Sequence, residues 1–597
     1  MVVVAKGVIQ GVVGSLFSVH AVLSQNQTNG NSTLGTPTAP KLPHFMRNNP
    51  LPYGFPWGRL TANDTNYYNE WPNTGVTRNY DFTVSRGTIA PDGYERKVLL
   101  VNGAFPGPTI EANWGDWIEV KVTNNITDDP EGTAIHWHGF QQRNTQWEDG
   151  VPAISQCPIA PGKTYIYRFQ ATLYGTTWYH SHYSSQYAGG LFGPMVIYGP
   201  IKSQPEIDLG PVLLSDWYHK QYFDLVEDIL QVGGNGIVLS DNNLINGKGN
   251  FDCSTVAAGD NTECTNNAGI SKFTFQPGKT HRLRLINSGA EAVQRFSIDD
   301  HTLTVIANDF VEVEPYDTKV VTLGIGQRTD VLVKANAANN NTRGSYWMRS
   351  NISSCSLTNQ PLGIAAVYYD QADQTLAPTS TAWDVPDPGN CVNDDLAITK
   401  PVMKLKPAAA AVNKTIEINV FRNASGIIQW SLDGVVFRGN FNQPTLLQSN
   451  KGDLVFDNDW NVDNFGNNGS IIVVVSNNSP AAHPMHLHGF NMYILHEGEG
   501  LTWDGTITNP DNPQRRDVQQ VRAGGHMVMQ FDSNENPGVW PFHCHIAWHS
   551  SAGLFAQFLV QPEKVKQLNI PQKVTDTCTD WQLWTQSNIP DVIDSGQ

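Results

Sequence analysis

Trp540-Pro-Phe-His-Cys-His545 is followed, after seven residues, by Gly553-Leu-Phe555. Near the start of the chain, Trp178-Tyr-His-Ser-His182 is followed, again after seven residues, by Gly190-Leu-Phe192. Two phrases that share aromatic, histidine and glycine positions at one spacing indicate duplication of a domain. The first and last thirds of the chain are therefore predicted to be copies of one domain.

The repeat extends upstream of these phrases. His486-Leu-His-Gly-Phe490 in the last third matches His136-Trp-His-Gly-Phe140 in the first. The middle third has Tyr346-Trp-Met-Arg-Ser350 at the corresponding place, without a histidine. We therefore expect three related β-domains, with boundaries near residues 200 and 400, a linker within residues 371–412 and no histidine chemistry in the middle domain. Each third also contains one strand-like phrase: Trp117–Thr123, in which apolar and polar residues alternate, His281–Ser288 and Ile471–Asn478.

The composition supports an all-β fold and excludes several classes of protein. The 597 residues would make about four domains at roughly 150 residues each, with three or five also allowed. Gly 52 and Pro 36, with many short runs of β-branched and aromatic residues, are typical of an all-β chain with many turns. The 17 Trp exclude a mainly disordered chain. A net charge of −17 without a Lys/Arg cluster argues against a nucleic-acid partner, and no stretch predicts a membrane span.

Several features predict that the chain is secreted. Residues 1–21 place Lys6 before an apolar stretch and resemble a signal peptide, with a tag remnant or disordered tail as the alternative. Residues 22–76 are polar and rich in Asn, Thr and Pro, which indicates a pro-segment or an extended arm. The acidic charge fits a soluble extracellular protein. Ten sequons give mild support for a secreted glycoprotein, at Asn26, Asn31, Asn63, Asn125, Asn340, Asn351, Asn413, Asn423, Asn468 and Asn477.

The histidines are concentrated far beyond chance. Ten of the 17 His fall in four windows that together span 19 residues, at 136–138, 180–182, 483–488 and 543–549. In a strand, side chains two residues apart point to the same face, so each His-x-His pair presents two imidazoles together. Two pairs come from each of two domains, and eight imidazoles are too many for one ion. We expect them to converge between the first and last domains around a metal cluster, for which imidazole ligands allow Cu, Zn, Ni or Fe.

Cys544 favours copper among these metals. It lies between His543 and His545, so its side chain points away from the cluster face. There it can meet His483 and His549, and two imidazoles with a thiolate are the ligand set of a blue-copper site. A structural zinc site is the alternative, but zinc has no need for a His-Cys-His connection between two sites.

The repeat itself tests this interpretation. The first domain has Thr133, Ser181 and Gln186 at the positions that align with the three ligands of the thiolate site. All three ligands are missing together, while the His-x-His pairs remain. One thiolate site is therefore expected, in the last domain only. Because the chain has seven Cys, at least one lies outside any disulfide, and we expect that residue to be Cys544.

These motifs resemble the four copper signatures of multicopper oxidases. The resemblance covers roughly residues 77–597, and within the family the chain is most similar to fungal laccases of the ascomycete kind. It implies four copper ions per chain and three tandem cupredoxin-like Greek-key β-barrel domains, at residues 77–200, 201–400 and 401–597. The matching segments are His136-Trp-His-Gly139, His180-Ser-His182, His483-Pro-Met-His-Leu-His-Gly489 and His543-Cys-His-Ile-Ala-Trp-His549.

The resemblance also implies which residue binds which copper. The type-1 copper would be held by His483, Cys544 and His549, and the exposed edge of one of these imidazoles would take up the electrons. The type-2 copper would be held by His136 and His486. The two type-3 coppers would use the six remaining histidines, with His138, His180 and His545 on one ion and His182, His488 and His543 on the other.

Three further residues are candidates for roles around the coppers. Leu554 stands at the axial position of the type-1 site and cannot coordinate, which should favour Cu(I), although it can equally be a core residue like the aligned Leu191. Asp241, in Asp241-Asn-Asn-Leu-Ile-Asn-Gly247, resembles the acidic pocket residue that accepts the donor's proton, with a surface turn as the alternative. Asp149 resembles the carboxylate that passes protons to the cluster, with an Asp-Gly turn as the alternative.

The remaining expectations concern the ends of the chain and the cysteines. Asp517 could orient a ligand imidazole. The tail ends in Gln597, where ascomycete laccases often have an apolar residue that plugs a channel to the cluster, so a plug here would be polar. The resemblance suggests the disulfides Cys157–Cys578 and Cys355–Cys391, and Cys253–Cys264 follows by elimination.

The sequence therefore predicts a secreted laccase, a benzenediol:oxygen oxidoreductase that is monomeric and bound to neither nucleic acid nor membrane. It would take single electrons from phenolic donors and reduce O2 to water. Lignin-like phenols, melanin precursors and plant defence phenols all fit as donors, and lignin degradation is one expected role. The alternatives are another multicopper oxidase, such as a ferroxidase or an ascorbate oxidase, and a non-catalytic copper-binding cupredoxin protein.

Overall fold

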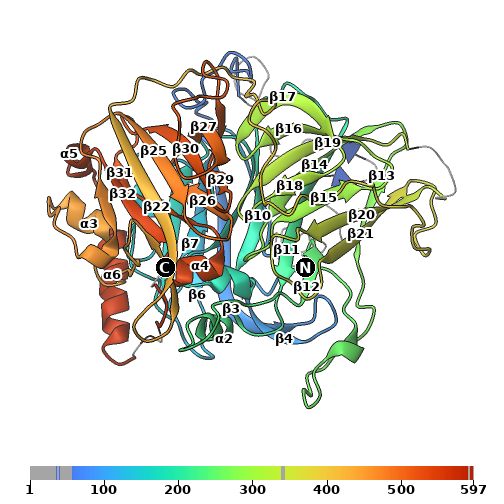
Figure 1. Ribbon diagram of the computed structural model, residues 1–597, viewed down its shortest axis with the longest axis horizontal. Coiled ribbons are helices and arrows are strands. Elements are labelled where there is room, and N and C mark those ends of the chain that lie inside the picture. The colour runs from blue at the N-terminus through green and yellow to red at the C-terminus, as the bar shows by residue number, and fades with distance from the viewer. Residues whose placement is uncertain are drawn as a thin grey trace, which may run out of the picture.

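The computed structural model describes residues 57–337, 343–588, 590 and 592–595, with the two-residue strands β1 (Gly35–Thr36) and β2 (Ala39–Pro40). The predicted signal segment, the sequons at Asn26, Asn31 and Asn340, and Gln597 lie outside these residues. The described chain forms three β-domains in sequence order, each made of two sheets. In Figure 1 the third domain lies on the left and the second on the right, with strands of the first domain between them.

The first domain consists of two four-stranded sheets, ordered β4-β3-β6-β8 and β5-β10-β9-β7. Two short 3-10 helices, η2 (Gln146–Glu148) and η3 (Gln186–Gly189), lie in its loops. Its strands are β3 (Thr77–Ile89), β4 (Arg96–Val101), β5 (Ile110–Asn113), β6 (Trp117–Asn124), β7 (Ile135–Trp137), β8 (Thr164–Gln170), β9 (Gly175–Ser181) and β10 (Phe192–Tyr198).

The second domain consists of a six-stranded sheet, β12-β11-β14-β19-β16-β17, and a five-stranded sheet, β13-β21-β20-β15-β18. Helix α2 (Tyr222–Ile229) and η4 (Cys253–Thr255) lie on either side of β12 along the chain. The strands are β11 (Ile207–Trp217), β12 (Asn242–Ile245), β13 (Ser271–Phe275), β14 (Thr280–Asn287), β15 (Gln294–Ile298), β16 (Leu303–Asn308), β17 (Val311–Thr318), β18 (Val321–Leu323), β19 (Arg328–Lys334), β20 (Ser345–Ile352) and β21 (Leu362–Tyr369).

The third domain has the same plan, with sheets β23-β22-β25-β30-β27-β28 and β24-β32-β31-β26-β29. Its helical elements are α3 (Thr445–Asn450), η5 (Asn458–Trp460), α4 (Ala547–Ser551), α5 (Pro562–Val565) and α6 (Gln572–Thr585). Its strands are β22 (Val412–Arg422), β23 (Ile428–Leu432), β24 (Val462–Asn464), β25 (Ser470–Asn477), β26 (His483–Leu487), β27 (Met492–Glu499), β28 (Gln514–Arg516), β29 (Val518–Val521), β30 (Gly525–Asp532), β31 (Gly538–Cys544) and β32 (Phe555–Val560).

The strand order confirms that the three domains are related. When strands are numbered within each domain, both sheets of the second and third domains have the same order, and the first domain follows it with fewer strands. In every domain the first long strand pairs in parallel with a later one, as β3 with β6, β11 with β14 and β22 with β25. The middle domain is therefore a full copy of the fold. None of the described strands crosses residue 200 or 400, and the exact boundaries stay a prediction.

The three strand-like phrases differ in how their two faces are buried. In β6 buried and half-exposed residues alternate, as expected for a strand with one solvated face. Strands β14 and β25 are buried almost throughout, because each lies inside a six-stranded sheet that is covered on both faces. Two polar residues of β14 are tolerated there because Arg284 bonds Asp208 at 2.6 Å and Arg282 forms an ion pair with Asp330.

The described part of the N-terminal arm packs against the first domain. Tyr67 is buried beside Tyr174, and Trp71 donates its indole N–H to Gln170 at 3.0 Å. Tyr68 accepts a hydrogen bond from Asn491 of the third domain at 3.1 Å. Residues 57–76 are therefore an anchored part of the fold rather than a purely polar segment.

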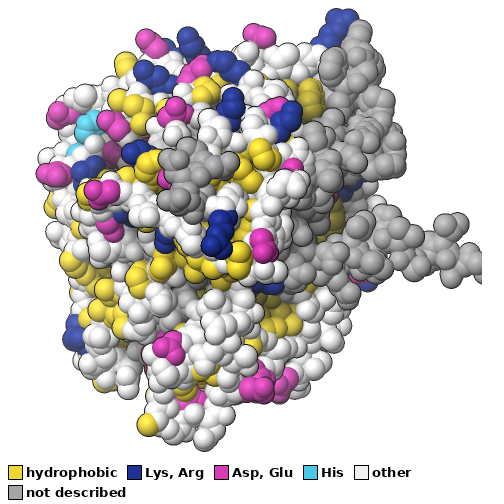
Figure 2. Space-filling view, turned by 90° about the vertical axis from the view of Figure 1, so that its right-hand side faces the viewer, with side chains coloured by type: hydrophobic (Ala, Val, Ile, Leu, Met, Phe, Trp, Pro, Cys, Tyr) yellow, Lys and Arg dark blue, Asp and Glu magenta, His cyan; other side chains and the backbone are white. Residues whose placement is uncertain are grey.

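Charged side chains of both signs lie on the surface. On the face drawn in Figure 2, basic and acidic side chains are interspersed and neither sign covers a large field. Among the described residues, no helix is long and apolar enough to cross a lipid bilayer.

Three disulfides join the pairs expected above, Cys157–Cys578, Cys253–Cys264 and Cys355–Cys391, and Cys544 is a free, buried thiol. The bond from Cys578 fastens helix α6 to the first domain. Beside it, Trp581 is buried and Lys573 bonds Glu148 at 2.6 Å. The C-terminal tail is therefore held to the first domain by both covalent and packing interactions.

We expect that removing the long-range disulfide destabilises the protein more than removing the local one. Cys157→Ala/Cys578→Ala should lower the melting temperature and expose α6 to proteases, because the bond closes 421 residues of chain and such bonds commonly contribute about 2–4 kcal/mol. Cys253→Ala/Cys264→Ala, which opens a separation of only 11 residues, is the matched control. Equal losses in thermal melting would contradict the expectation.

Candidate copper centres

The clustered histidines lie at the ends of four strands, two in each terminal domain. His136 lies in the short strand β7 and pairs with His180 of β9 in the strand register. In the third domain, His486 of β26 faces His543 of β31 in the same way. The second member of each pair follows its strand by one residue, so the two imidazoles are not both within the strand as predicted. They still point to one side, and the expected convergence between the domains is present.

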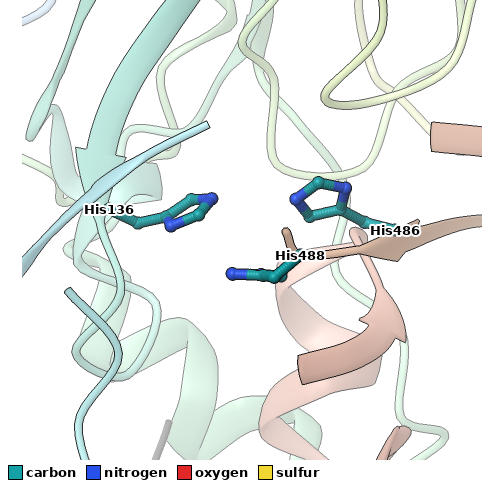
Figure 3. Close-up of side chains that lie close together, drawn as sticks. All are labelled: His136, His486 and His488. Atoms are coloured by element: carbon teal, nitrogen blue, oxygen red, sulfur yellow. The ribbon is translucent and has the colours of Figure 1, made fainter. Parts of the chain in front are cut away.

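Imidazoles of the first and third domains interleave at this junction. The rings of His136 and His488 lie 4.0 Å apart between centroids, and those of His138 and His486 lie 4.1 Å apart. Figure 3 shows His136 reaching from the first domain toward His486 and His488 of the third. All eight rings are buried. The cluster therefore exists only where the two domains meet.

Donor atoms come close enough in several groups to share a metal ion. His182, His488 and His543 form one group, in which all ligand atoms lie within 4.8 Å, and it matches one expected type-3 set. His136 and His486, the expected type-2 pair, also meet the 4.8 Å limit together with His488. For the other type-3 set, His138 groups with His180, and its Nδ1 lies 3.3 Å from Nε2 of His545.

In most of the clustered histidines the hydrogen bonds leave one ring nitrogen free to coordinate a metal ion. Backbone carbonyls accept Nδ1–H from four rings at 2.8–2.9 Å, those of His136, His180, His486 and His543. These bonds fix the tautomer, so that Nε2 carries the lone pair. The buried Nε2 atoms of His136, His180 and His486 have no hydrogen-bond partner among the described residues. Unpaired buried nitrogens that point at one another fit a metal cluster, because they would otherwise carry an uncompensated desolvation cost.

Two aspartates bind the cluster histidines in a crossed, symmetric pattern. Asp149 of the first domain accepts Nδ1–H of His136 with its carbonyl and Nδ1–H of His488, from the third domain, with its carboxylate at 2.9 Å. Asp517 of the third domain accepts from His486 with its carbonyl at 2.8 Å. Its carboxylate accepts Nε2–H of His138, from the first domain, at 3.1 Å. Each aspartate therefore holds one histidine of its own domain and one of the other.

The second domain joins this pattern through Arg328. Its guanidinium donates to the carboxylate of Asp517 at 2.6 Å and to the carbonyl of Thr176 in the first domain at 3.2 Å. All of these groups are fully buried. Sequence reasoning missed Arg328, because a single arginine after Gly-Gln carries no motif that links it to the histidines.

The thiol of Cys544 lies on the other side of β31, as expected. Its Sγ is 3.5 Å from Nδ1 of His483 and 3.7 Å from Nδ1 of His549, and the two nitrogens are 3.1 Å apart. For bonds of about 2.3 Å to sulfur and 2.0 Å to nitrogen, a trigonal arrangement puts the donor atoms about 3.5–3.7 Å apart. These three atoms therefore fit one ion with only a small change in the separation of the nitrogens.

Other residues support the thiolate site, and the sequence did not reveal two of them, Ser479 and Trp430. Ser479 contacts Nε2 of His483 at 2.9 Å and so leaves Nδ1 facing the thiol. Trp430 packs its ring on His549 with centroids 4.2 Å apart. Leu554 is fully buried in the core, and its carbonyl accepts the backbone N–H of Cys544 at 3.2 Å. Leu554 therefore lies in the core beside Cys544, which suits both of the roles considered for it.

The described end of the tail lies beside the cluster. Asp594 accepts hydrogen bonds from Ser184 at 2.6 Å and from Ser551 at 3.2 Å, and it is buried. Ser184 lines a cavity together with His182 and His543. The tail thus reaches the cluster, although the expected role of Gln597 concerns a residue outside the described range.

The carboxylate of Asp241 is hydrogen-bonded to residues of the second domain and not to the thiolate site. Its carboxylate accepts the backbone N–H of His219 at 2.8 Å and a hydrogen bond from Asn359 at 3.3 Å, and its side chain is half-buried. These bonds hold it at the rim of the second domain, close to Tyr218, whose hydroxyl is 3.3 Å from the indole nitrogen of Trp548. Trp548 directly precedes His549, so the region around Asp241 approaches the thiolate site from the second domain.

Burial shifts the pKa values of these groups in the direction that metal binding requires. Desolvation lowers the pKa of His543 and of His549 to about 3, and it lowers the pKa of His138, His180 and His488 well below the usual value. The imidazoles are therefore neutral at pH 7 and can coordinate. Burial raises the pKa of the Cys544 thiol, so a metal ion would have to displace its proton.

These shifts predict that the copper-free protein loses stability in mild acid. Below pH 6.5 the histidines of the unfolded chain take up protons, whereas the buried ones stay neutral until about pH 3, so the free energy of unfolding falls as the pH falls through this window. Each such histidine adds a slope of about 1.4 kcal/mol per pH unit. Urea unfolding at several pH values would measure it, and His549→Gln should have a shallower slope than the wild type. The same slope in both proteins would contradict the assignment.

Comparison with known proteins gives the family of the chain. Three family models, each described as multicopper oxidase, match residues 83–202, 208–372 and 431–564. Laccase-2 of Botryotinia fuckeliana is 38% identical over 90% of this chain and 92% of its own length. Dihydrogeodin oxidase of Aspergillus terreus is 35% identical over 85% of this chain and 87% of its own length.

Solved structures agree with this result. The crystal structure of laccase from Botrytis aclada superposes with a TM-score of 0.82 at 35% identity, over 91% of this chain and 98% of that one. The expected cupredoxin-like architecture of the three domains is thereby confirmed. The matches to all three domains, together with the histidine clusters at the domain junction, show that the chain belongs to the multicopper oxidase family.

Proposed function

We propose that the protein is a laccase, which oxidises phenolic donors one electron at a time and reduces O2 to water. The observation that carries this proposal is the position of Cys544. Its thiol meets His483 and His549 on one side of β31, while its two chain neighbours, His543 and His545, turn their rings into the cluster on the other side. A storage or structural site would not need this short covalent connection between a thiolate site and a cluster.

The proposed ligand sets follow the groups described above. His483, Cys544 and His549 would hold one copper ion. The eight histidines of the domain junction would hold three more, with His136 and His486 on one ion, His138, His180 and His545 on a second, and His182, His488 and His543 on the third. Bound copper would supply one-electron chemistry at the thiolate and four-electron reduction of O2 at the cluster. Four phenols would lose four electrons and four protons, which balance the conversion of one O2 to two water molecules.

His549 is the proposed point at which electrons enter. It is half-buried, whereas His483 and Cys544 are fully buried, so only His549 offers a ring edge near the surface. Trp430 covers one face of its ring. A flat aromatic donor could therefore approach the ring edge while Trp430 excludes water from the face.

The chain also offers carboxylates for the protons. Asp241 is the proposed acceptor of the donor's proton, held in place by the N–H of His219 and the amide of Asn359. Asp149 is the proposed carboxylate on the cluster side, where it bonds His488. Burial raises the pKa of Asp149, so its carboxylate takes up a proton more readily than an exposed one.

We further propose that the protein works outside the cell as a monomer and glycoprotein. Three disulfides support an oxidising compartment. Among the described sequons, Asn477 is not suited to a glycan, because its side chain is fully buried and donates to the carbonyls of Ala481 and Arg522. Asn63, Asn125 and Asn351 are exposed and suited to one.

The proposal is tested by the stoichiometry of O2 uptake. Copper-loaded protein should consume one O2 for every four molecules of 2,6-dimethoxyphenol oxidised, without releasing peroxide. An oxygen electrode and a peroxide assay measure both quantities. Uptake with Fe(II) but not with the phenol would replace the laccase by a ferroxidase and leave the copper sites intact.

Cys544→Ser is the matched variant for this experiment. The smaller, harder hydroxyl should abolish the blue absorption and O2 uptake, while the eight histidines of the junction still retain about three copper ions per chain. A variant that keeps wild-type turnover would refute the oxidase mechanism. A colourless wild type with full copper content would do the same.

A further prediction concerns Asp241. Asp241→Asn keeps the shape of the side chain but removes its basicity, so kcat/KM for 2,6-dimethoxyphenol should fall at least about tenfold. Oxidation of ferrocyanide, which releases no proton, should be unaffected. If both donors slow equally, Asp241 has only a structural role.

A further inference from the structure

Two histidines of the third domain form a pair in the sheet that does not contain the copper-ligand strands β26 and β31. Outside the ten clustered histidines, the described chain contains five more. Three of them are satisfied by groups other than histidine: His219 bonds Asp92, His281 accepts from the backbone of Gln276, and His301 bonds Asp299 and Tyr369. The other two, His496 and His526, face each other on neighbouring strands of the third domain.

The two rings are brought together by an irregularity in the strand pairing. The register between β27 and β30 shifts between Ile494 and His496, after which His496 pairs with Val528 and Gly498 with His526, so the two histidines are diagonal neighbours on one face of the sheet. The rings are parallel within 8°, and Nδ1 of His496 lies 3.1 Å from Nε2 of His526. Gly498 leaves the space for them, because a Cβ there would lie 3.0 Å from His526 and 3.2 Å from His496.

The hydrogen bonds of His526 present a lone pair to His496. Its Nδ1–H donates to the carbonyl of Gly500 at 2.8 Å, which fixes Nε2 as the unprotonated nitrogen. A backbone carbonyl on the far nitrogen is the usual support of a metal-binding histidine. With metal–nitrogen bonds of about 2.0–2.1 Å and angles between 90° and 110°, two imidazole nitrogens lie about 2.9–3.4 Å apart, and the observed distance falls in this range.

The surroundings favour a cation at this place. His526 is buried while His496 is half-buried, so one side of the pair is open to solvent for water ligands. Burial and the neighbouring His526 lower the pKa of His496, which favours its neutral ring, and the carboxylate of Asp504 in the adjoining loop acts on His496 with the opposite sign. Arg522 lies near the same ring and opposes a cation, so Asp504 is the group that offsets it.

We propose that His496 and His526 form a second, surface metal site that binds one divalent first-row ion of the imidazole-preferring kind, Zn²⁺ or Cu²⁺. The two imidazoles supply two ligands, and water supplies the others, with Asp504 within electrostatic reach. The site does not include the coppers that the oxidase reaction uses. The proposal can therefore be tested separately from the proposed laccase activity.

The test uses Zn²⁺ and the fully copper-loaded enzyme. A crystal soaked in Zn²⁺ should show an anomalous peak at the zinc edge between Nδ1 of His496 and Nε2 of His526. Isothermal titration should give one Zn²⁺ per chain, and Zn²⁺ should raise the melting temperature because it binds the folded chain. His526→Gln and His496→Gln should each weaken Zn²⁺ binding at least tenfold.

His219→Gln is the matched control, because it removes a partly exposed imidazole that has no imidazole neighbour, and it should leave Zn²⁺ binding unchanged. If the pair is only an internal hydrogen bond, the soaked wild type shows no anomalous peak at this place and the titration gives no binding. Binding that survives in both histidine variants would likewise overturn the proposal. The anomalous peak in the wild type decides the question even if a variant fails to fold.

Discussion

The crossed hydrogen bonds of Asp149 and Asp517 are the constraint on which the copper centres depend. Each aspartate binds one histidine of its own domain through a carbonyl and one of the opposite domain through its carboxylate. The orientation of His488 and of His138 therefore depends on a carboxylate of the opposite domain. Arg328 adds the second domain, and the loss of one partner from such a buried charged pair commonly costs about 3–5 kcal/mol. The hydrogen bonds that orient the cluster thus involve all three domains.

This constraint gives the second domain a role beside the cluster. Its two sheets have the same strand order as those of the third domain, and among the described residues none of the close groups of three donor atoms lies in it. Its Arg328 donates a hydrogen bond to Asp517 of the third domain. Its Asp309 accepts a hydrogen bond from Arg516 of the third domain at 3.0 Å, beside the cluster. It also supplies the segment of Asp241 and Tyr218 near the thiolate site. The second domain positions the chemistry of the other two and contributes to the surface that a donor would meet.

The sequence alone was sufficient to predict the features that recur in the first and last domains. The spacing around His180 and His543 predicted the duplicated domains, the facing imidazoles and the thiol on the opposite side of β31, because strand alternation makes these local properties. It was not sufficient for partners brought together by the fold. Arg328 and Trp430 reach their histidines through pairings between domains or between distant strands, and no local pattern marks them. The second histidine of each pair lies past its strand for a similar reason, since the strand ends where the two domains meet.

The arrangement also separates a fully buried cluster from the more exposed surroundings of His549. The cluster and its aspartates are buried at a junction where any change in one group disturbs several others. The surroundings of His549 are different, because Trp430 of β23 packs on its ring and Tyr218 of the second domain contacts the preceding residue, Trp548. A laccase and a dihydrogeodin oxidase each match at least 85% of this chain, so relatives with different names are similar to it over both the buried junction and the more exposed surroundings of His549.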